Sequence, residues 1–162
     1  MHTIERSAPS TTFALWQRLA ARPLGKLLFS VASWVRVPYF GTILPTVVRM
    51  RPGEAEVRAP KWWGVHNHLG TFHAIAMCNL AEYAMGMLAE ATVPATHRWI
   101  PRHMNVDYLA KAKTGLRAVA AVTPLPVFGP DAVDLPVPVL IYDSTGRVVV
   151  QAIITIKVSP RD

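Results

Sequence analysis

Cysteine, charge and long apolar runs are all scarce in this sequence, and each shortage excludes a class of protein. The single cysteine, Cys78, excludes an internal disulfide bond and a cysteine-based zinc site, so we expect a buried, reduced thiol in a cytoplasmic protein. No run of apolar residues reaches the ~18 that a membrane-spanning helix needs. The formal net charge is +7, but basic residues never form a block of five, so no nucleic-acid partner is predicted.

Apolar residues, in contrast, are abundant. Hydrophobic residues make up 51% of the 162 residues and charged residues 17%, which is more apolar than an average soluble domain. A chain of this length forms one compact domain with a core of its own. The surplus therefore indicates a further buried surface, either a contact between subunits of a homodimer or homotetramer or the lining of a ligand tunnel.

The first part of the chain is predicted to form a basic helical arm. Residues 6–36 contain no acidic side chain, and they carry two segments with apolar residues at helical spacing. The Arg22-Pro23 pair separates the two segments, because the residue before a proline avoids helical backbone angles. With Pro38 closing it, this arm is expected to span residues 1–38 and to pack on a domain formed by residues 39–162. Contact of the arm with a membrane surface is the less favoured alternative.

The remaining residues predict an α+β fold built from one long helix and a largely antiparallel sheet. The helix is expected to begin after Thr71 and to run to about Ala91, with apolar side chains on most of its sides, as in a buried helix. Alternating or β-branched runs bounded by turn signals predict strands at 43–51, 54–60, 97–113, 116–124, 137–143 and 147–158. A sheet of five or six strands wrapped around one central helix would bury that helix in this way.

One acid interrupts the apolar helix. Glu82 is the only formally charged side chain between Lys61 and Glu90. A buried carboxylate without a partner is disfavoured. Two explanations follow: either Glu82 pairs with an arginine from a neighbouring strand or subunit, or it is a functional acid that borders a cavity.

The spacing of polar residues around the start of this helix resembles a family signature. In Asn67-x-x-Gly70-x-x-His73, followed by Leu80-Ala81-Glu82, the acid lies fifteen residues after the asparagine and nine after the histidine. This pattern resembles that of hotdog-fold thioesterases of the phenylacetyl-CoA thioesterase-like branch. The variant His-Leu-Gly-Thr-x-His-Ala at residues 68–74 is closer still to a hotdog subfamily that is grouped as a domain of unknown function.

The resemblance implies a hotdog fold and hydrolysis of an acyl-CoA thioester in a pocket between two protomers, with no cofactor and no metal. It implies that Glu82 is the catalytic carboxylate, acting as general base on water or as nucleophile, and that Asn67 and His73 assist it. The backbone N–H groups of Phe72 and His73 would stabilise the oxyanion at the helix N-terminus.

Coenzyme A carries phosphate groups that require cations. Lys111, Lys113 and Arg117 flank the turn between two predicted strands and are the first candidates for this role. Arg98 and Arg102 are the next candidates. The alternative is that these side chains belong to an ordinary solvated strand edge.

Two other functions fit a hotdog fold. His73 and Glu82 supply the histidine and carboxylate that hotdog hydratases and dehydratases pair on the same motif. A scaffold that binds acyl-CoA or lipid without turnover is favoured by one departure from the family pattern, because Ala74 and Ile75 stand where the family has two glycines.

The histidines suggest a metal site as a weaker alternative. His66 and His68 share one face of an extended segment, and together with His73 and Glu82 they could form a three-histidine, one-carboxylate set. The carboxylate that a cupin motif requires a few residues after its second histidine is missing, so no metal is predicted.

Overall fold

Helices dominate the N-terminal part of the chain, and strands dominate the C-terminal part. The computed structural model describes residues 8–161, so the first seven residues of the predicted arm lie outside the described residues. The elements are α1 (Thr11–Leu19), α2 (Gly25–Arg36), α3 (Pro38–Gly41), β1 (Thr46–Arg51), β2 (Glu54–Ala59), a 3₁₀ turn (Trp63–Val65), α4 (Ala74–Thr92), β3 (His97–Tyr108), β4 (Leu116–Ala121), β5 (Val133–Tyr142) and β6 (Val148–Pro160). Among these residues, none of the helices has the length and apolar character required to cross a membrane.

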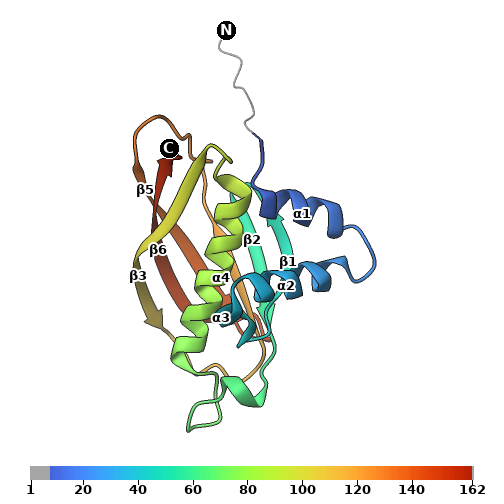
Figure 1. Cartoon of the computed structure of the whole chain (residues 1–162). Coiled ribbons are helices and arrows are strands. Elements are labelled where there is room, and N and C mark those ends of the chain that lie inside the picture. The colour runs from blue at the N-terminus through green and yellow to red at the C-terminus, as the bar shows by residue number, and fades with distance from the viewer. Residues whose placement is uncertain (1–7, 162) are drawn as a thin grey trace.

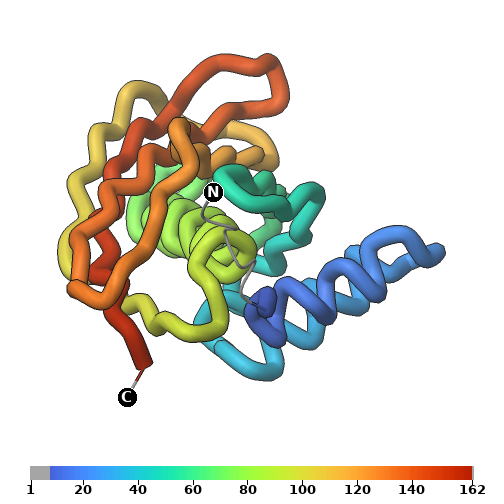
Figure 2. Tube along the Cα trace, turned by 90° about the horizontal axis from the view of Figure 1, so that it is seen from above, coloured from blue at the N-terminus to red at the C-terminus, as the bar shows by residue number. Residues whose placement is uncertain are grey.

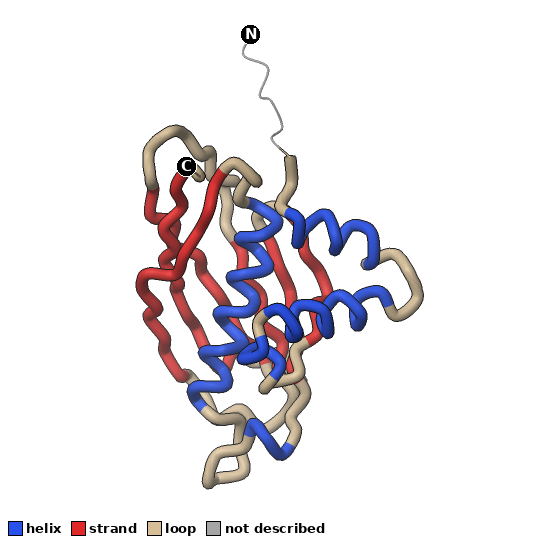
Figure 3. The backbone as a smooth tube through the Cα atoms, in the orientation of Figure 1, coloured by secondary structure: helices blue, strands red, loops and turns tan. Residues whose placement is uncertain are grey.

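The six strands form one antiparallel sheet in the order β1-β2-β4-β5-β6-β3. The long helix α4 lies against one face of this sheet and contacts every strand (Figures 1 and 3). Side chains alternate between the two faces, so Leu116, Ala118 and Ala120 of β4 are buried while Arg117 between them stays partly exposed. The core therefore lies between α4 and the sheet. The predicted combination of one long helix with an antiparallel sheet is confirmed.

The N-terminal helices α1 and α2 form a hairpin that projects from the body of the molecule (Figure 2). Ser10 ties the start of α1 to α4, because its Oγ accepts a hydrogen bond from the N–H of Phe13 at 3.0 Å and donates one to the carbonyl of Glu90 at 2.8 Å. Pro38 does not close this region as the sequence suggested, but begins the short helix α3. Proline is favoured at that position, because the first helical N–H has no partner inside the helix.

The contact between α2 and α4 includes a buried tyrosine. The hydroxyl of Tyr83 on α4 lies 2.6 Å from Oγ of Ser33 on α2, and the Tyr83 side chain is fully buried. Burial disfavours the charged phenolate and raises the pKa of Tyr83 to about 12, although the Ser33 hydroxyl acts in the opposite direction.

This pKa predicts how alkaline pH affects stability. The folded-state pKa lies above the unfolded value of 10, so the stabilisation is complete below pH 10 and is lost as the pH rises to about 12. We expect the ionisation of Tyr83 to lower the free energy of unfolding by roughly 2–3 kcal/mol over this interval, and Tyr83→Phe to remove that part of the total fall. Urea unfolding at a series of pH values measures it. Tyr39→Phe, at an exposed tyrosine, is the control and should keep the wild-type slope. An unchanged slope in Tyr83→Phe would show that other groups cause the loss.

Candidate active site

Glu82 lies on the one open stripe of α4. Ile75, Cys78 and Glu82 follow one another at helical spacings and are partly or fully exposed, whereas Leu80 and Tyr83 nearby are buried. Glu82 is therefore half-buried and not enclosed in the core. It forms no hydrogen bond or ion pair with any residue in the described part of the chain. Among those residues no arginine pairs with Glu82, so the explanation that Glu82 has a structural role is not supported within the chain.

His73 caps the N-terminus of α4, where the sequence had suggested Thr71. Its Nδ1 accepts a hydrogen bond from the N–H of Ile75 at 3.1 Å. A ring nitrogen that accepts a hydrogen bond carries no proton, so in this arrangement the proton of the neutral ring is on Nε2. The exposed edge of His73 is thus a hydrogen-bond donor beside the start of the helix.

The oxyanion donors predicted from the sequence are already used. The N–H of Phe72 donates to the carbonyl of Ala112 at 2.8 Å, and the N–H of His73 donates to the carbonyl of Val65 at 2.7 Å. Neither group is free to stabilise an oxyanion, so this prediction is corrected. Within residues 8–161, the N–H groups of Ala74 and Ala76 in the first turn of α4 have no acceptor, and these two are available to a ligand.

Asn67 shapes the loop that precedes the helix. Its Oδ1 accepts hydrogen bonds from the N–H groups of Leu69 at 3.0 Å and Thr71 at 3.1 Å, and its Nδ2 donates to Oγ1 of Thr71 at 2.9 Å. This is the bonding of an asparagine that closes a turn. Within the described chain, no hydrogen bond joins Asn67 to Glu82. One proton of Nδ2 is left for another acceptor.

A second asparagine, which the sequence did not single out, borders the start of α4. Asn79 lines a cavity of about 260 Å³ together with His66 and His73. Its Nδ2 donates to the carbonyl of Tyr39 at 3.2 Å and weakly to Oγ1 of Thr42 at 3.4 Å, which fixes the orientation of the amide. The side chain is only 5% exposed, and its buried Oδ1 has no hydrogen-bond partner in the described chain. Buried polar atoms normally have a partner, so this oxygen is suited to accept a hydrogen bond from a bound molecule.

The unpaired oxygen predicts an unusual effect on stability. Replacing Asn79 with leucine removes two hydrogen bonds but also removes a buried acceptor that has none, so we expect the free energy of unfolding to change by less than about 1 kcal/mol. Chemical denaturation measures this. The matched control is Ser30→Ala, because the fully buried Ser30 hydroxyl has partners on both sides, the carbonyl of Lys26 and the N–H of Val47. Its loss should cost about 1–3 kcal/mol. A similar loss in Asn79→Leu would show that Asn79 serves the fold alone.

The candidate phosphate-binding cations separate in the structure. Lys111 and Lys113 are exposed on either side of the buried Ala112, whose carbonyl accepts the Phe72 N–H, so this loop adjoins the start of α4. Arg117 instead lies on the sheet face that points away from α4. Its Nη1 is 3.9 Å from the carboxylate of Glu56, and its guanidinium is 4.3 Å from the centre of the Tyr142 ring.

The remaining candidates are not assembled into a site. Arg102 pairs with Asp134 at 3.2 Å, and Nε of Arg98 donates to Oγ of Ser159 at 3.3 Å.

In the part of the chain that the structure describes, no group of three or more histidine, cysteine, aspartate or glutamate side chains is arranged to hold a metal ion. The three-histidine set is therefore not formed.

Comparison with known proteins agrees with this architecture. The family model "domain of unknown function (DUF4442)" matches residues 25–158, beginning at the first residue of α2. No curated protein matches the chain. A crystal structure from a structural-genomics programme is 42% identical, with a TM-score of 0.79, and the match covers 93% of this chain and 98% of that one.

More distant structures share the fold alone. A probable thioesterase of unknown function from Pseudomonas aeruginosa is 19% identical with a TM-score of 0.73, and 96% of this chain and 99% of that one are covered. A mutant of a thioesterase enzyme from Staphylococcus aureus is 17% identical with a TM-score of 0.66, and the match covers 76% and 99% of the two chains. The chain therefore belongs to the DUF4442 family of domains of unknown function, and it shares its fold with solved structures that are named as thioesterases.

Proposed function

We propose that this protein hydrolyses an acyl-CoA thioester in a pocket shared by two protomers, with Glu82 as the catalytic carboxylate. The observation that carries the proposal is the position of Glu82, a half-buried acid without a partner in the described chain, on the one open stripe of an otherwise buried helix. Because no contact within the described chain occupies this carboxylate, it is available to a substrate or to a water molecule. The names of the two distant structures, thioesterase and probable thioesterase, support the same class of reaction.

The chemistry needs a base and an oxyanion site. Glu82 takes a proton from a water molecule, and the water oxygen bonds to the thioester carbonyl carbon. Negative charge on the carbonyl oxygen is stabilised by the N–H groups of Ala74 and Ala76 and by Nε2–H of His73. The carbon–sulfur bond then breaks, and the coenzyme A thiolate leaves with the proton that Glu82 took from water, which returns Glu82 to its charged form. Direct attack by Glu82, through a mixed anhydride, uses the same groups.

The spacing along α4 supports a site that is shared with a second protomer. Ala74 and Glu82 are eight residues apart, which corresponds to about 12 Å along a helix axis. A single thioester carbonyl, which needs donors at about 3 Å, does not reach both from one chain. A two-fold dimer with its α4 helices side by side and antiparallel brings the N-terminus of one helix to the middle of the other. In such a homodimer, Glu82 of one protomer acts with the helix N-terminus of its partner.

Other residues near the start of α4 are assigned roles in this shared site. The free proton on Nδ2 of Asn67 contacts the substrate carbonyl or the attacking water from the facing protomer. Oδ1 of Asn79 accepts a hydrogen bond from a water molecule near the helix start. Lys111 and Lys113 bind the phosphates of coenzyme A, because their loop is hydrogen-bonded to the segment that opens the helix. We do not include Arg117, which lies on the opposite sheet face with Glu56.

Thiol release from a panel of acyl-CoA thioesters tests the proposal. The purified protein should release free thiol at rates that saturate with substrate, without added metal. Binding of acyl-CoA without release would overturn hydrolysis and favour a non-catalytic scaffold. Formation of a 3-hydroxyacyl-CoA from an enoyl-CoA, without thiol release, would identify a hydratase in place of a hydrolase.

A further inference from the structure

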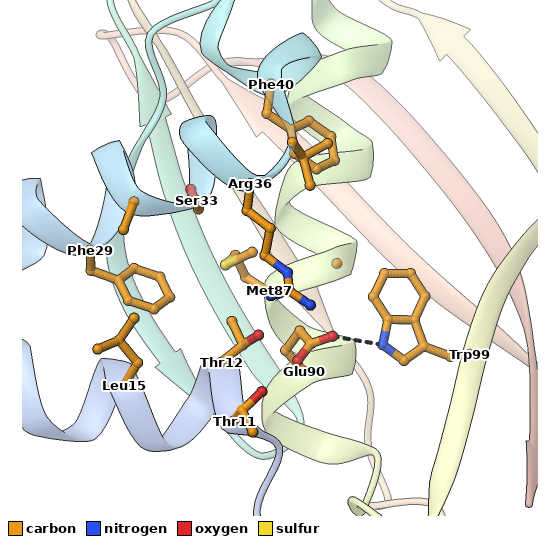
Figure 4. A pocket seen from close by; sticks show the side chains of 13 residues that line it. Thr11, Thr12, Leu15, Phe29, Ser33, Arg36, Phe40, Met87, Glu90 and Trp99 are labelled. Atoms are coloured by element: carbon orange, nitrogen blue, oxygen red, sulfur yellow. Dashed lines mark hydrogen bonds between the residues drawn. The ribbon is translucent and has the colours of Figure 1, made fainter. Parts of the chain in front are cut away.

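A cavity of about 300 Å³ lies between the helical arm and the domain behind it. Figure 4 shows side chains from α1, α2 and α3 on one side of it and side chains from α4 and β3 on the other. Its volume is at the lower end of the range of small-ligand pockets, about 300–1,000 Å³. Most of its wall is apolar, with Phe29, Phe40 and Met87 as large contributors.

This cavity continues the helix stripe on which Glu82 lies. Glu82, Gly86 and Glu90 are spaced by four residues, so they follow one another along one face of α4. Gly86 and Glu90 line the cavity and Glu82 does not. The cavity therefore begins about one helical turn, roughly 6 Å, beyond the candidate catalytic carboxylate.

Gly86, which lines the cavity on the side nearer to Glu82, leaves space between α4 and β3. A Cβ atom at this position would lie 3.5 Å from Cη2 of Trp99, which is an ordinary van der Waals contact. A methyl group would thus fit, but a larger side chain would occupy the space between α4 and β3.

The far end of the cavity is polar. Arg36 and Glu90 both point into it, and Glu90 is held in place by a hydrogen bond of 3.2 Å from Nε1 of Trp99 (Figure 4). An alkyl chain entering from Glu82 first meets apolar walls and then these charged groups. A longer chain would push its methyl end against them and take them out of water, which is unfavourable.

We propose that this cavity binds the acyl chain of the substrate and that the arm thereby selects apolar chains of medium length. The inference rests on the proposed function, in which the thioester is held at Glu82. The distance from Glu82 to Glu90 is about 12 Å along the axis, of which the cavity takes the second half, and a zigzag chain with bonds of about 1.5 Å advances roughly 1.3 Å per carbon. An acyl chain that starts at Glu82 and ends before Glu90 therefore has roughly eight to ten carbons.

Chain-length profiles test the proposal. For the wild-type protein, kcat/KM should rise from acetyl- to decanoyl-CoA and fall for palmitoyl-CoA, because each buried methylene contributes roughly four-fold. Gly86→Leu should lower the ratio of decanoyl- to acetyl-CoA turnover by at least about ten-fold. Ala32→Leu should act in the same direction from the arm, and because Ala32 is exposed on α2, this variant does not disturb the core.

The matched control is Ala21→Leu, which adds the same side chain to an exposed position of the arm outside the cavity. It should leave the chain-length ratio unchanged. A flat wild-type profile, or a ratio that Ala32→Leu and Gly86→Leu leave intact, overturns the proposal.

Binding separates this inference from the proposed hydrolysis. Thioether analogues of acetyl- and decanoyl-CoA, which no hydrolase cleaves, are titrated into the wild type and Ala32→Leu by calorimetry. Tighter binding of the decanoyl analogue, reduced in Ala32→Leu, supports an acyl site even if no thiol is released from any substrate. Equal affinities for the two analogues overturn the acyl site even if hydrolysis is observed.

Discussion

Replacing Glu82 with glutamine is expected to lower kcat/KM for thioester hydrolysis by about 10³-fold, within the range that general-base catalysis contributes. Glutamine has nearly the shape of glutamate but cannot take a proton from water. Glu82 has no hydrogen bond or ion pair to lose within the described chain, so the fold should not respond. The loss should appear mainly in kcat, because the carboxylate acts in the transition state more than in binding.

The measurement is thiol release under saturating and limiting substrate, with the melting temperature recorded for each variant. Asp131→Asn makes the same chemical change at an exposed loop position and should leave the rate at the wild-type level. Turnover by Glu82→Gln at the wild-type rate would remove the mechanism, whereas an equal fall in Asp131→Asn would point to a general effect of charge.

The fold was predictable because its signals are local. The turns that join β1 to β2 and β5 to β6 contain Gly53 and Gly146, whose φ angles of 79° and 86° suit glycine and few other residues. The burial of the long helix was also predictable, because apolar residues lie on most of its sides. The predicted strand 97–113 is too long, since β3 ends at Tyr108. Beyond that point the chain leaves the sheet, and a carbonyl in this loop accepts the N–H of Phe72, a contact that no periodicity encodes.

The site was predictable in residue type but not in detail. A helix N-terminus beside His73 follows from the motif, and Glu82 follows from its isolation among apolar residues. Which N–H groups are free depends instead on distant carbonyls, since Ala112 occupies the donor of Phe72 and lies forty positions away. Asn79 was missed because its significance is an unpaired buried oxygen. The signal present in the sequence was an amide inside the most apolar helix.

Mixing two inactive variants should restore activity if the site is shared between protomers. We choose Asn67→Asp and Glu82→Gln. Aspartate keeps an oxygen for the N–H groups of Leu69 and Thr71, so the loop is preserved, but it lacks the Nδ2 donor that we assign to catalysis. Each homodimer should therefore be folded and nearly inactive.

A hybrid dimer carries one change in each protomer. If Asn67 of one protomer serves Glu82 of the other, one site of the hybrid is intact and the second carries both changes. Random reassortment of equal amounts makes half of the dimers hybrids, so about a quarter of wild-type activity should return. The experiment unfolds and refolds the two variants together, with each variant refolded alone as control, and measures thiol release. If both residues served the same protomer's site, every site in the mixture would carry one change, and no activity would return.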